Sequence, residues 1–133
     1  MAANTTPIFA LTPKMAVGRI TGTTTDKSGL TTTNLVTLVT AATDGTKVTQ
    51  IGFKSLGNSG AGTFLIFITD TDGTTVRFFD EILVSAVTTS PSALSARQVN
   101  FYSDLQLKSG QKILVGATVL TTAMDAFAQI GDF

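Results

Sequence analysis

The sequence predicts an all-β protein: a single antiparallel β-sandwich, jelly-roll-like, with about eight strands. Short apolar and β-branched runs recur at roughly even spacing between Gly, Asp, Asn and Pro turn signals. No window keeps the apolar period of an amphipathic helix through its Thr, Val and Gly content. Threonine is abundant, and a β-branched hydroxyl residue suits a half-exposed strand. With 133 residues the chain fits one domain whose core needs no disulfide or metal.

The densest apolar run and the clearest turn signal both lie in residues 62–84. The run FLIFI at 64–68 is too short for a typical helix, so it predicts a strand buried on both faces. Asp72-Gly73 predicts a tight reversal into a second strand at 74–84. Strict alternation places Val76, Phe78, Ile82 and Val84 on one face of that strand and Arg77, Phe79, Glu81 and Leu83 on the other. We expect the opposing sheet to cover one side of this hairpin and a neighbouring subunit to cover the other.

The other strands are expected at 15–24, 35–41, 46–56, 97–103 with a continuation at 105–107, 112–120 and 123–133. In the third strand Val48 has the opposite parity to Ile51 and Phe53, which predicts either a bulge near residues 49–50 or a strand covered on both sides. Val99 and Phe101 are expected to face inward. The Ser/Thr/Ala/Pro-rich segment 85–96 predicts a long surface loop.

The N-terminal segment 1–14 contains two of the three prolines and is predicted to be an extended arm, with a disordered terminus as the alternative. The β-sandwich domain is then expected over residues 15–133. Ile8, Phe9 and Leu11 give the arm enough apolar character to bind a neighbour. The segment has no basic n-region, so it does not resemble a signal peptide.

Composition excludes several classes of function. The sequence has no Cys and no His, which removes thiolate chemistry, Cys-type zinc sites and the usual general base. Nine basic residues are balanced by nine acidic ones and are scattered, so no nucleic-acid partner is expected. No stretch approaches the roughly 20 apolar residues of a membrane span. With no signal peptide and no such span, a protein in the cytoplasm of the cell that makes it is expected. Only 14% of residues are charged, which predicts that much of the surface is committed to partner proteins.

Two acidic motifs have residue types that occur in chemical sites. Asp70-x-Asp72-Gly73-Thr74 with Glu81 superficially resembles a calcium loop, but Thr75 stands where an EF-hand needs Gly, so a hairpin turn is favoured. The neighbours Asp80 and Glu81 should point to opposite faces of a strand, which does not suit a glycosidase pair. One of the two is expected to pair with a Lys or Arg at a sheet edge or subunit boundary.

The remaining candidates are also better explained by structure than by chemistry. The Gly-rich loop 57–62 lacks the Lys and following helix of a P-loop. No Ser or Thr has a partner that would activate it as a nucleophile. Tyr102 and the nine Phe residues have the chemistry to line a sugar-binding face, but aromatic residues at strand spacing favour a core. The sequence therefore predicts no catalytic residue, no cofactor, no metal ligand and no enzymatic activity.

Five stretches together resemble small β-rich virion proteins of tailed bacteriophages. They are AANTTPIFALTPK, LVTAATDGTKVTQIGFKSLGNSGAGTFLIFI, FFDEILVSAVTTSPS, LQLKSGQKILVGAT and the final AQIGDF. The resemblance covers most of the chain and follows a pattern of strands and turns. It contains no catalytic motif.

This resemblance implies a jelly-roll or β-sandwich protein that decorates or cements the capsid, often as a homotrimer. The implied partner is the major capsid protein or another virion protein, and the implied location is the capsid surface of a virion assembled in the bacterial host cytoplasm. The arm, with Asp132 and Phe133 at the other end of the chain, provides the candidate interface. Two alternatives remain open: a tail, baseplate or head-fibre component, and a carbohydrate- or receptor-binding β-sandwich.

Overall fold

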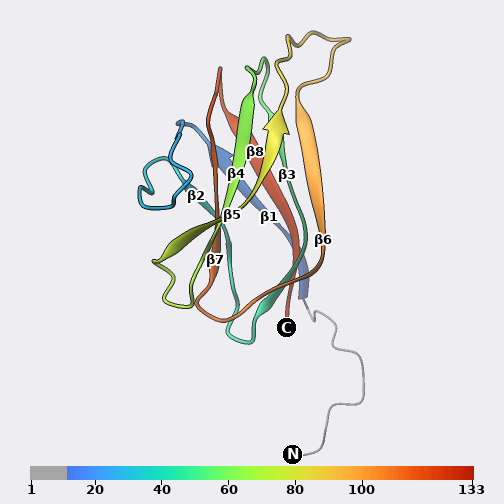
Figure 1. Ribbon diagram of the computed structural model, residues 1–133. Helices are drawn as coiled ribbons and strands as arrows, with labels where there is room; N and C mark the ends of the chain where they lie inside the picture. Colours follow the sequence, from blue (N-terminus) through green and yellow to red (C-terminus); the bar gives the residue numbers. More distant parts are fainter. Residues whose placement is uncertain (1–11) are drawn as a thin grey trace, which may run out of the picture.

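The computed structural model describes residues 12–133, which fold into two packed antiparallel sheets (Figure 1). The strands are β1 (Thr12–Ile20), β2 (Val36–Thr40), β3 (Thr46–Ser55), β4 (Gly62–Thr69), β5 (Val76–Val84), β6 (Arg97–Leu107), β7 (Lys112–Ala117) and β8 (Met124–Asp132). One sheet has the order β1-β8-β3-β6 and the other has the order β2-β7-β4-β5. The predicted antiparallel sandwich of about eight strands is confirmed. β1 begins at Thr12, so the last three residues assigned to the arm belong to the first strand.

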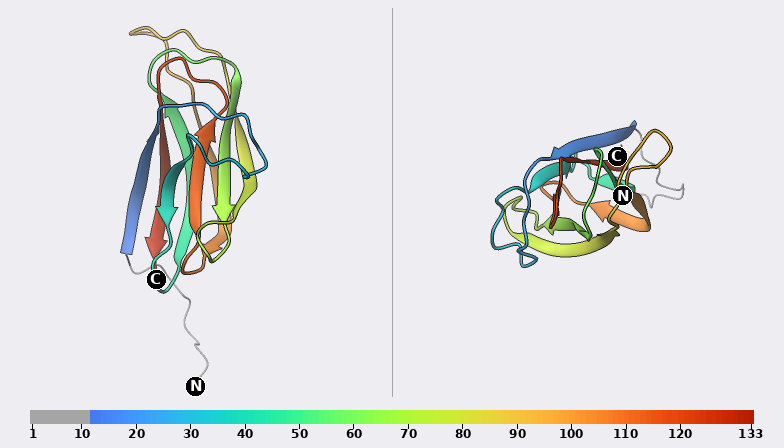
Figure 2. Two further views of the ribbon diagram at one scale, coloured as in Figure 1. Left: turned by 90° about the vertical axis from the view of Figure 1, so that its left-hand side faces the viewer. Right: turned by 90° about the horizontal axis from the view of Figure 1, so that it is seen from above.

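The pairing of the strands gives the sandwich its jelly-roll-like topology. β1 pairs with β8, β2 with β7, β3 with β6, and β4 with β5, as in one long hairpin. The hairpin is rolled up so that β3 also pairs with β8 and β4 also pairs with β7. The resulting two layers are seen side-on and from above in Figure 2. This rolling brings β1 next to the C-terminal strand.

The hydrophobic core lies between the two sheets, where their inward side chains meet. In β3 the register shifts between Val48 and Gln50, which confirms the bulge, the first of the two predicted alternatives. Because of this extra residue, Val48, Ile51 and Phe53 all point into the core despite their mixed parity. The rings of Phe53 and Phe64 lie 5.2 Å apart and join the two sheets.

The β4 run is buried on both faces, as predicted: residues 64–67 are all 0% exposed. The outer face of β4 is covered by the chain itself, whereas Phe79 and Leu83 of β5 in the same hairpin stay exposed. The connection between β1 and β2 crosses in front of this sheet (Figure 2, left). Its residues Thr24 and Leu35 lie so close to Gly116 that an added Cβ would meet their side chains at 3.0 and 2.7 Å. Gly116 pairs with Leu65 of β4, which places this cover over the strand.

In β5 the predicted division of side chains between two faces is wrong, because the strand contains a bulge. Ile66 pairs with Asp80 whereas Phe67 pairs with Phe78, so Phe79 is an extra residue. Ile82 and Val84 share a face, as expected, and that face is the core side. The bulge moves Val76 and Phe78 to the outer side. The Phe78 ring lies 5.3 Å from that of Phe67 there.

Candidate functional site

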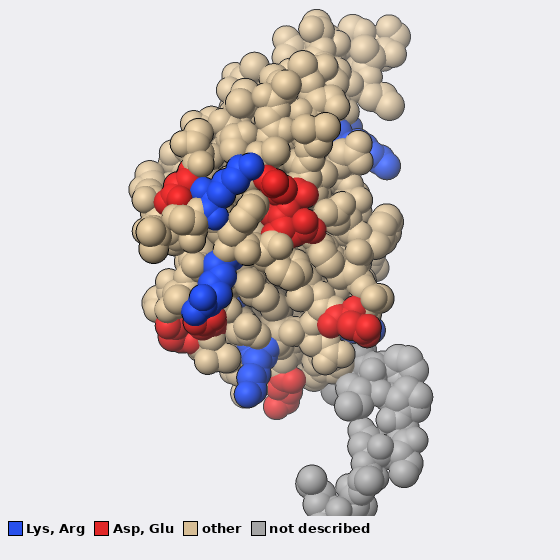
Figure 3. Space-filling view, viewed as in Figure 1, with Lys and Arg blue, Asp and Glu red and all other residues tan. Residues whose placement is uncertain are grey.

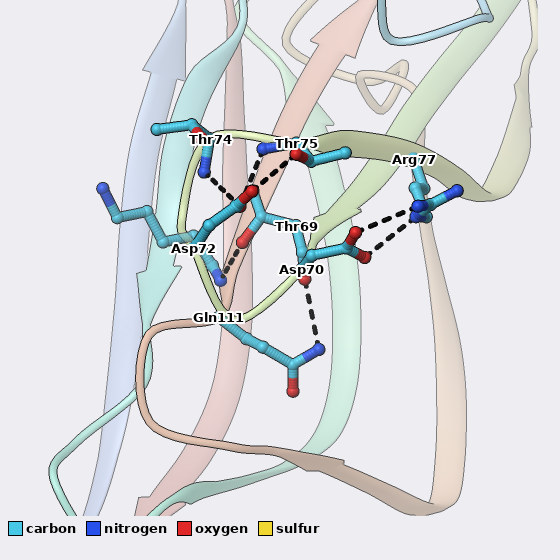
Figure 4. A network of polar contacts seen from close by, with 8 residues as sticks. Thr69, Asp70, Asp72, Thr74, Thr75, Arg77 and Gln111 are labelled. Atoms are coloured by element: carbon cyan, nitrogen blue, oxygen red, sulfur yellow. Dashed lines mark hydrogen bonds and ion pairs between the residues drawn. The ribbon is translucent and has the colours of Figure 1, made fainter.

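The predicted calcium-like motif is a hairpin turn (Figure 4). The Asp70 carboxylate accepts hydrogen bonds from Arg77 at 2.8 and 3.0 Å. The Asp72 carboxylate accepts three: 2.9 Å from each of the backbone N–H groups of Thr74 and Thr75, and 2.6 Å from the Thr75 hydroxyl. Each carboxylate therefore serves the turn. Within residues 12–133 no group of three or more Asp, Glu, His or Cys is placed to hold a metal ion.

These loop carboxylates predict an acid-sensitive fold. The hydroxyl and backbone donors of Thr75 hold the pKa of Asp72 at about 2, and those of Ser28 hold the pKa of Asp26 at about 2, against a usual 3.8. A depressed pKa stabilises the fold above about pH 4, and this contribution is lost as the pH falls toward about 2. We expect Asp72→Ala to reduce the drop in thermal midpoint between pH 6 and pH 3. An unchanged drop would contradict this role for Asp72.

Asp80 and Glu81 point in different directions, as predicted. Glu81 pairs with Lys27 at 2.8 Å, within the same chain. Asp80 accepts hydrogen bonds from the Tyr102 hydroxyl at 2.7 Å and the Asn100 amide at 3.0 Å, which ties β5 to β6 where the edges of the two sheets meet. Burial, followed by the bond to Asp80, raises the pKa of Tyr102. The hydroxyl of the only tyrosine is thus engaged within the fold, which does not favour a sugar-binding role for it.

One row of residues without polar side chains crosses all four strands on the outer face of the β1-β8-β3-β6 sheet. In register, Val17 of β1 lies beside Phe127 of β8, which lies beside Gly52 of β3 and then Val99 of β6. Exposed fractions are 66% for Val17 and 37% for Val99. The next row has Met15 and Phe101 at its ends, 55% and 78% exposed, with Gln129 and Gln50 between them. Unlike the outer face of the other sheet, this one has no segment of residues 12–133 lying across it (Figure 2).

The orientation of β6 is opposite to our expectation. Val99 and Phe101 were predicted to face inward, but Asn100 and Tyr102 have that orientation instead. The pairing with β3 explains this orientation. Ile51 and Phe53 face the core, so Gly52 between them faces outward, and its partner Val99 faces outward with it. Sequence reasoning also missed Met15 and Val17 as surface residues.

A groove lies on this face beside Gly52, where β6 packs closely against the glycine. A Cβ there would come within 2.6 Å of both the Gln98 carbonyl oxygen and the Val99 side chain. The groove has a volume of about 290 Å³. Its lining residues are Met15, Gln50, Gly52, Phe53, Lys54, Arg97, Val99 and Phe127.

The groove has a cationic end. Lys54 and Arg97 lie directly opposite each other in the β3–β6 register, and like charges in that position destabilise a sheet. Neither residue forms an ion pair within the part of the chain that the structure describes. Residues 1–11 contain no Asp or Glu that would neutralise them. Nearby, Asp125 is paired with Arg19 at 2.7 Å, which keeps the pKa of that carboxyl low.

The C-terminal candidate residues have partners within the chain. Asp132 accepts a 2.7 Å bond from the Thr46 hydroxyl and forms a 2.7 Å ion pair with Lys14, and these lower its pKa. The Phe133 N–H donates to the Gly45 carbonyl at 3.1 Å, and residue 133 lines a groove of about 550 Å³ at this end of the sandwich. Ile8, Phe9 and Leu11 lie outside the described residues.

The opposite end of the sandwich is free of charge. Its connections 56–61, 85–96 and 118–123 contain no Lys, Arg, Asp or Glu, and the upper end of the molecule is uniformly tan in Figure 3. The three connections bind one another through Ser59 with Val87, Asn58 with Thr89, and the Thr121 hydroxyl with the Asn58 carbonyl. Leu94 is 82% exposed there.

Comparison with known proteins gives little guidance. No family model matches the chain, and no curated protein matches it. Among solved structures it is similar to a chain of the "Cyanophage Pam1 capsid asymmetric unit", with 16% identity over 100% of this chain and 94% of that chain. The TM-score is 0.48, too low to show a shared function. In residues 12–133 there is no helix with the length and apolar character needed to cross a membrane.

Proposed function

We propose that this chain is a non-enzymatic structural protein of a tailed-bacteriophage virion, a decoration or cement protein that binds the lattice of the major capsid protein. The observation that carries the proposal is the uncovered apolar face around Gly52. Each Å² of apolar surface removed from water contributes about 25 cal/mol, so such a face favours a protein partner. The resemblance of the sequence to small phage virion proteins supports the choice of partner.

A cement protein needs no reactive group. It stabilises the assembled shell by binding it better than the free capsid subunits, which is mass action. Repetition over the lattice adds avidity where the geometry allows simultaneous contacts. A homotrimer on the capsid surface, assembled in the bacterial host cytoplasm, meets these requirements. This β-sandwich has few charged residues and has one end without any, which suits such a passive role.

The N-terminal segment is proposed to contribute Ile8, Phe9 and Leu11 to attachment. The described chain begins at Thr12, which pairs with Asp132 beside the C-terminus. A deletion that tests the segment should therefore stop at residue 11, because residues 12–14 form part of β1.

Co-sedimentation tests the function. The full chain is mixed separately with expanded heads and with isolated tails of the phage that encodes it. We expect saturable binding to heads. Deletion of residues 1–11 should reduce occupancy on heads while the thermal midpoint stays unchanged. Binding only to tails would instead favour the tail, baseplate or fibre alternative. Binding to neither would overturn a virion role and favour a glycan or receptor partner, and undiminished occupancy of the deletion variant would overturn the proposed arm.

A further inference from the structure

A row of charged side chains crosses the outer face of the β1-β8-β3-β6 sheet, beside the row that contains Gly52. In register it consists of Arg19, Asp125, Lys54 and Arg97, one from each strand. Each of these residues lies two positions along its strand from the row of Gly52, and side chains two positions apart share a face. Three cations and one carboxylate give this charged row a net charge of +2.

The carboxylate of the charged row is committed to Arg19. Asp125 accepts bonds of 2.7 and 3.2 Å from that guanidinium, one to each oxygen. Lys54, its neighbour on the other side in register, forms no ion pair within residues 12–133, and neither does Arg97. The excess positive charge of the row therefore lies on β3 and β6.

The surroundings of these two cations supply no second carboxylate. The connections at this end of the sandwich contain no Asp or Glu: 56–61, 85–96 and 118–123. The acidic residue of β6, Asp104, lies seven positions from Arg97, which is roughly 20 Å along the strand. Asp80 of β5 is turned to Tyr102 and Asn100. The chain alone therefore leaves two like charges opposed, an arrangement that destabilises a sheet.

The groove of about 290 Å³ on this face joins the two cations to an apolar surface. Lys54 and Arg97 line it together with three large apolar side chains, Met15, Val99 and Phe127. Arg97 and Val99 lie two positions apart on β6, a separation of about 7 Å. A ligand that fills the groove must therefore place a negative group and an apolar group roughly 7 Å apart, as residues i and i+2 of an extended chain do.

We infer that the capsid partner inserts into this groove a segment with an Asp or Glu side chain between Lys54 and Arg97 and an apolar side chain against Val99. The inference rests on the proposed function and names the chemistry that the partner presents to this face. A guanidinium forms two parallel hydrogen bonds with a carboxylate, and an ammonium adds a point charge. The carboxylate also removes the repulsion between the two cations. A partner with anionic groups alone, such as a nucleic acid, would leave the apolar part of the groove exposed to water.

A matched pair of variants tests the role of charge in co-sedimentation with expanded heads. Arg97→Gln should raise the dissociation constant roughly tenfold or more, because the partner carboxylate loses its bidentate donor. Arg77→Gln is the control: it removes the same charge from the other sheet, where the exposed ion pair with Asp70 contributes little to stability, and should leave head binding unchanged. Added salt should weaken binding of the native chain more than binding of Arg97→Gln. Thermal midpoints of the isolated variants check that both fold.

A carbodiimide cross-linker identifies the source of the carboxylate. It joins a carboxylate to an amine directly, with loss of water and no added spacer. On occupied heads we expect Lys54 to be joined to an Asp or Glu of the capsid protein, as located by mass spectrometry of the digested particles. Lys54→Arg keeps the charge but lacks the amine, so it should bind heads without forming this cross-link.

The outcomes separate this inference from the proposed function. If the native chain binds heads, three results would overturn only the inference: undiminished binding of Arg97→Gln, equal losses for the two Arg variants, or a Lys54 that is not cross-linked to the capsid protein. A cross-link from Lys54 to a second copy of this chain would assign the two cations to a contact between copies instead. Failure of the native chain to bind heads would overturn the proposed function and this inference with it.

Discussion

Replacing Phe67 with Ala is expected to lower the free energy of unfolding by about 3–5 kcal/mol, the usual cost of truncating a buried Phe. The Phe67 side chain is 0% exposed on the outer face of β4, with the Phe78 ring 5.3 Å away. Truncation removes these contacts and leaves a cavity that the rigid sheet closes poorly. Urea denaturation followed by circular dichroism measures the loss.

Leu30→Ala serves as the control for this prediction. Leu30 is 89% exposed, and its truncation should change the free energy of unfolding by no more than about 0.5 kcal/mol. The cost of Phe67→Ala should also be independent of protein concentration, because the chain itself covers this site. A cost below 1 kcal/mol, or one that grows with concentration, would contradict this assignment of the cover.

Gly110→Ala is expected to have the second-largest effect on stability, about 1–3 kcal/mol or more. Gly110 has φ +94°, and an added Cβ would lie 2.1 Å from the Thr71 carbonyl oxygen. That oxygen belongs to the turn between β4 and β5, whereas Gly110 belongs to the turn between β6 and β7. The two turns must therefore move apart to remove the clash. The same end of the sandwich is joined by Gln111, which donates a 3.1 Å bond to the Thr69 carbonyl (Figure 4).

Gly57→Ala separates the two sources of this effect. Gly57 also has a positive φ, +98°, but the nearest atom to an added Cβ is the Thr122 hydroxyl at 3.8 Å, an ordinary contact. This variant should show the backbone strain alone, and its thermal midpoint should fall less than that of Gly110→Ala. Equal losses would mean that the contact between the turns adds nothing.

Much of the fold was predictable because its signals are local. The Asp-Gly pairs, the apolar run at 64–68 and the parity break at Val48 specify turns, a buried strand and a bulge through interactions within a few residues. The pairing of one of the two carboxylates, Asp80 or Glu81, with a cation was also foreseen, but not that Glu81 and Lys27 would form it. The absence of Cys and His is a property of the sequence alone and limits the chemistry whatever the fold.

The tertiary structure decided which apolar residues face outward. The bulge at Phe79 reverses the parity of β5, and nothing near it in sequence marks an extra residue. Val99 faces outward because its strand pairs with β3 opposite Gly52, across 47 positions of chain. Alternation says which residues share a face, but only the packing of two sheets says which face is the core.

The sequence by itself determined that this chain is an antiparallel β-sandwich without Cys or His, since composition and local turn chemistry suffice for both. Only the tertiary structure decided that the 21–35 connection covers one outer face whereas the other outer face, around Gly52, stays open. The physical reason is that cover depends on contacts between distant segments, such as Leu35 over Gly116, which no local pattern encodes.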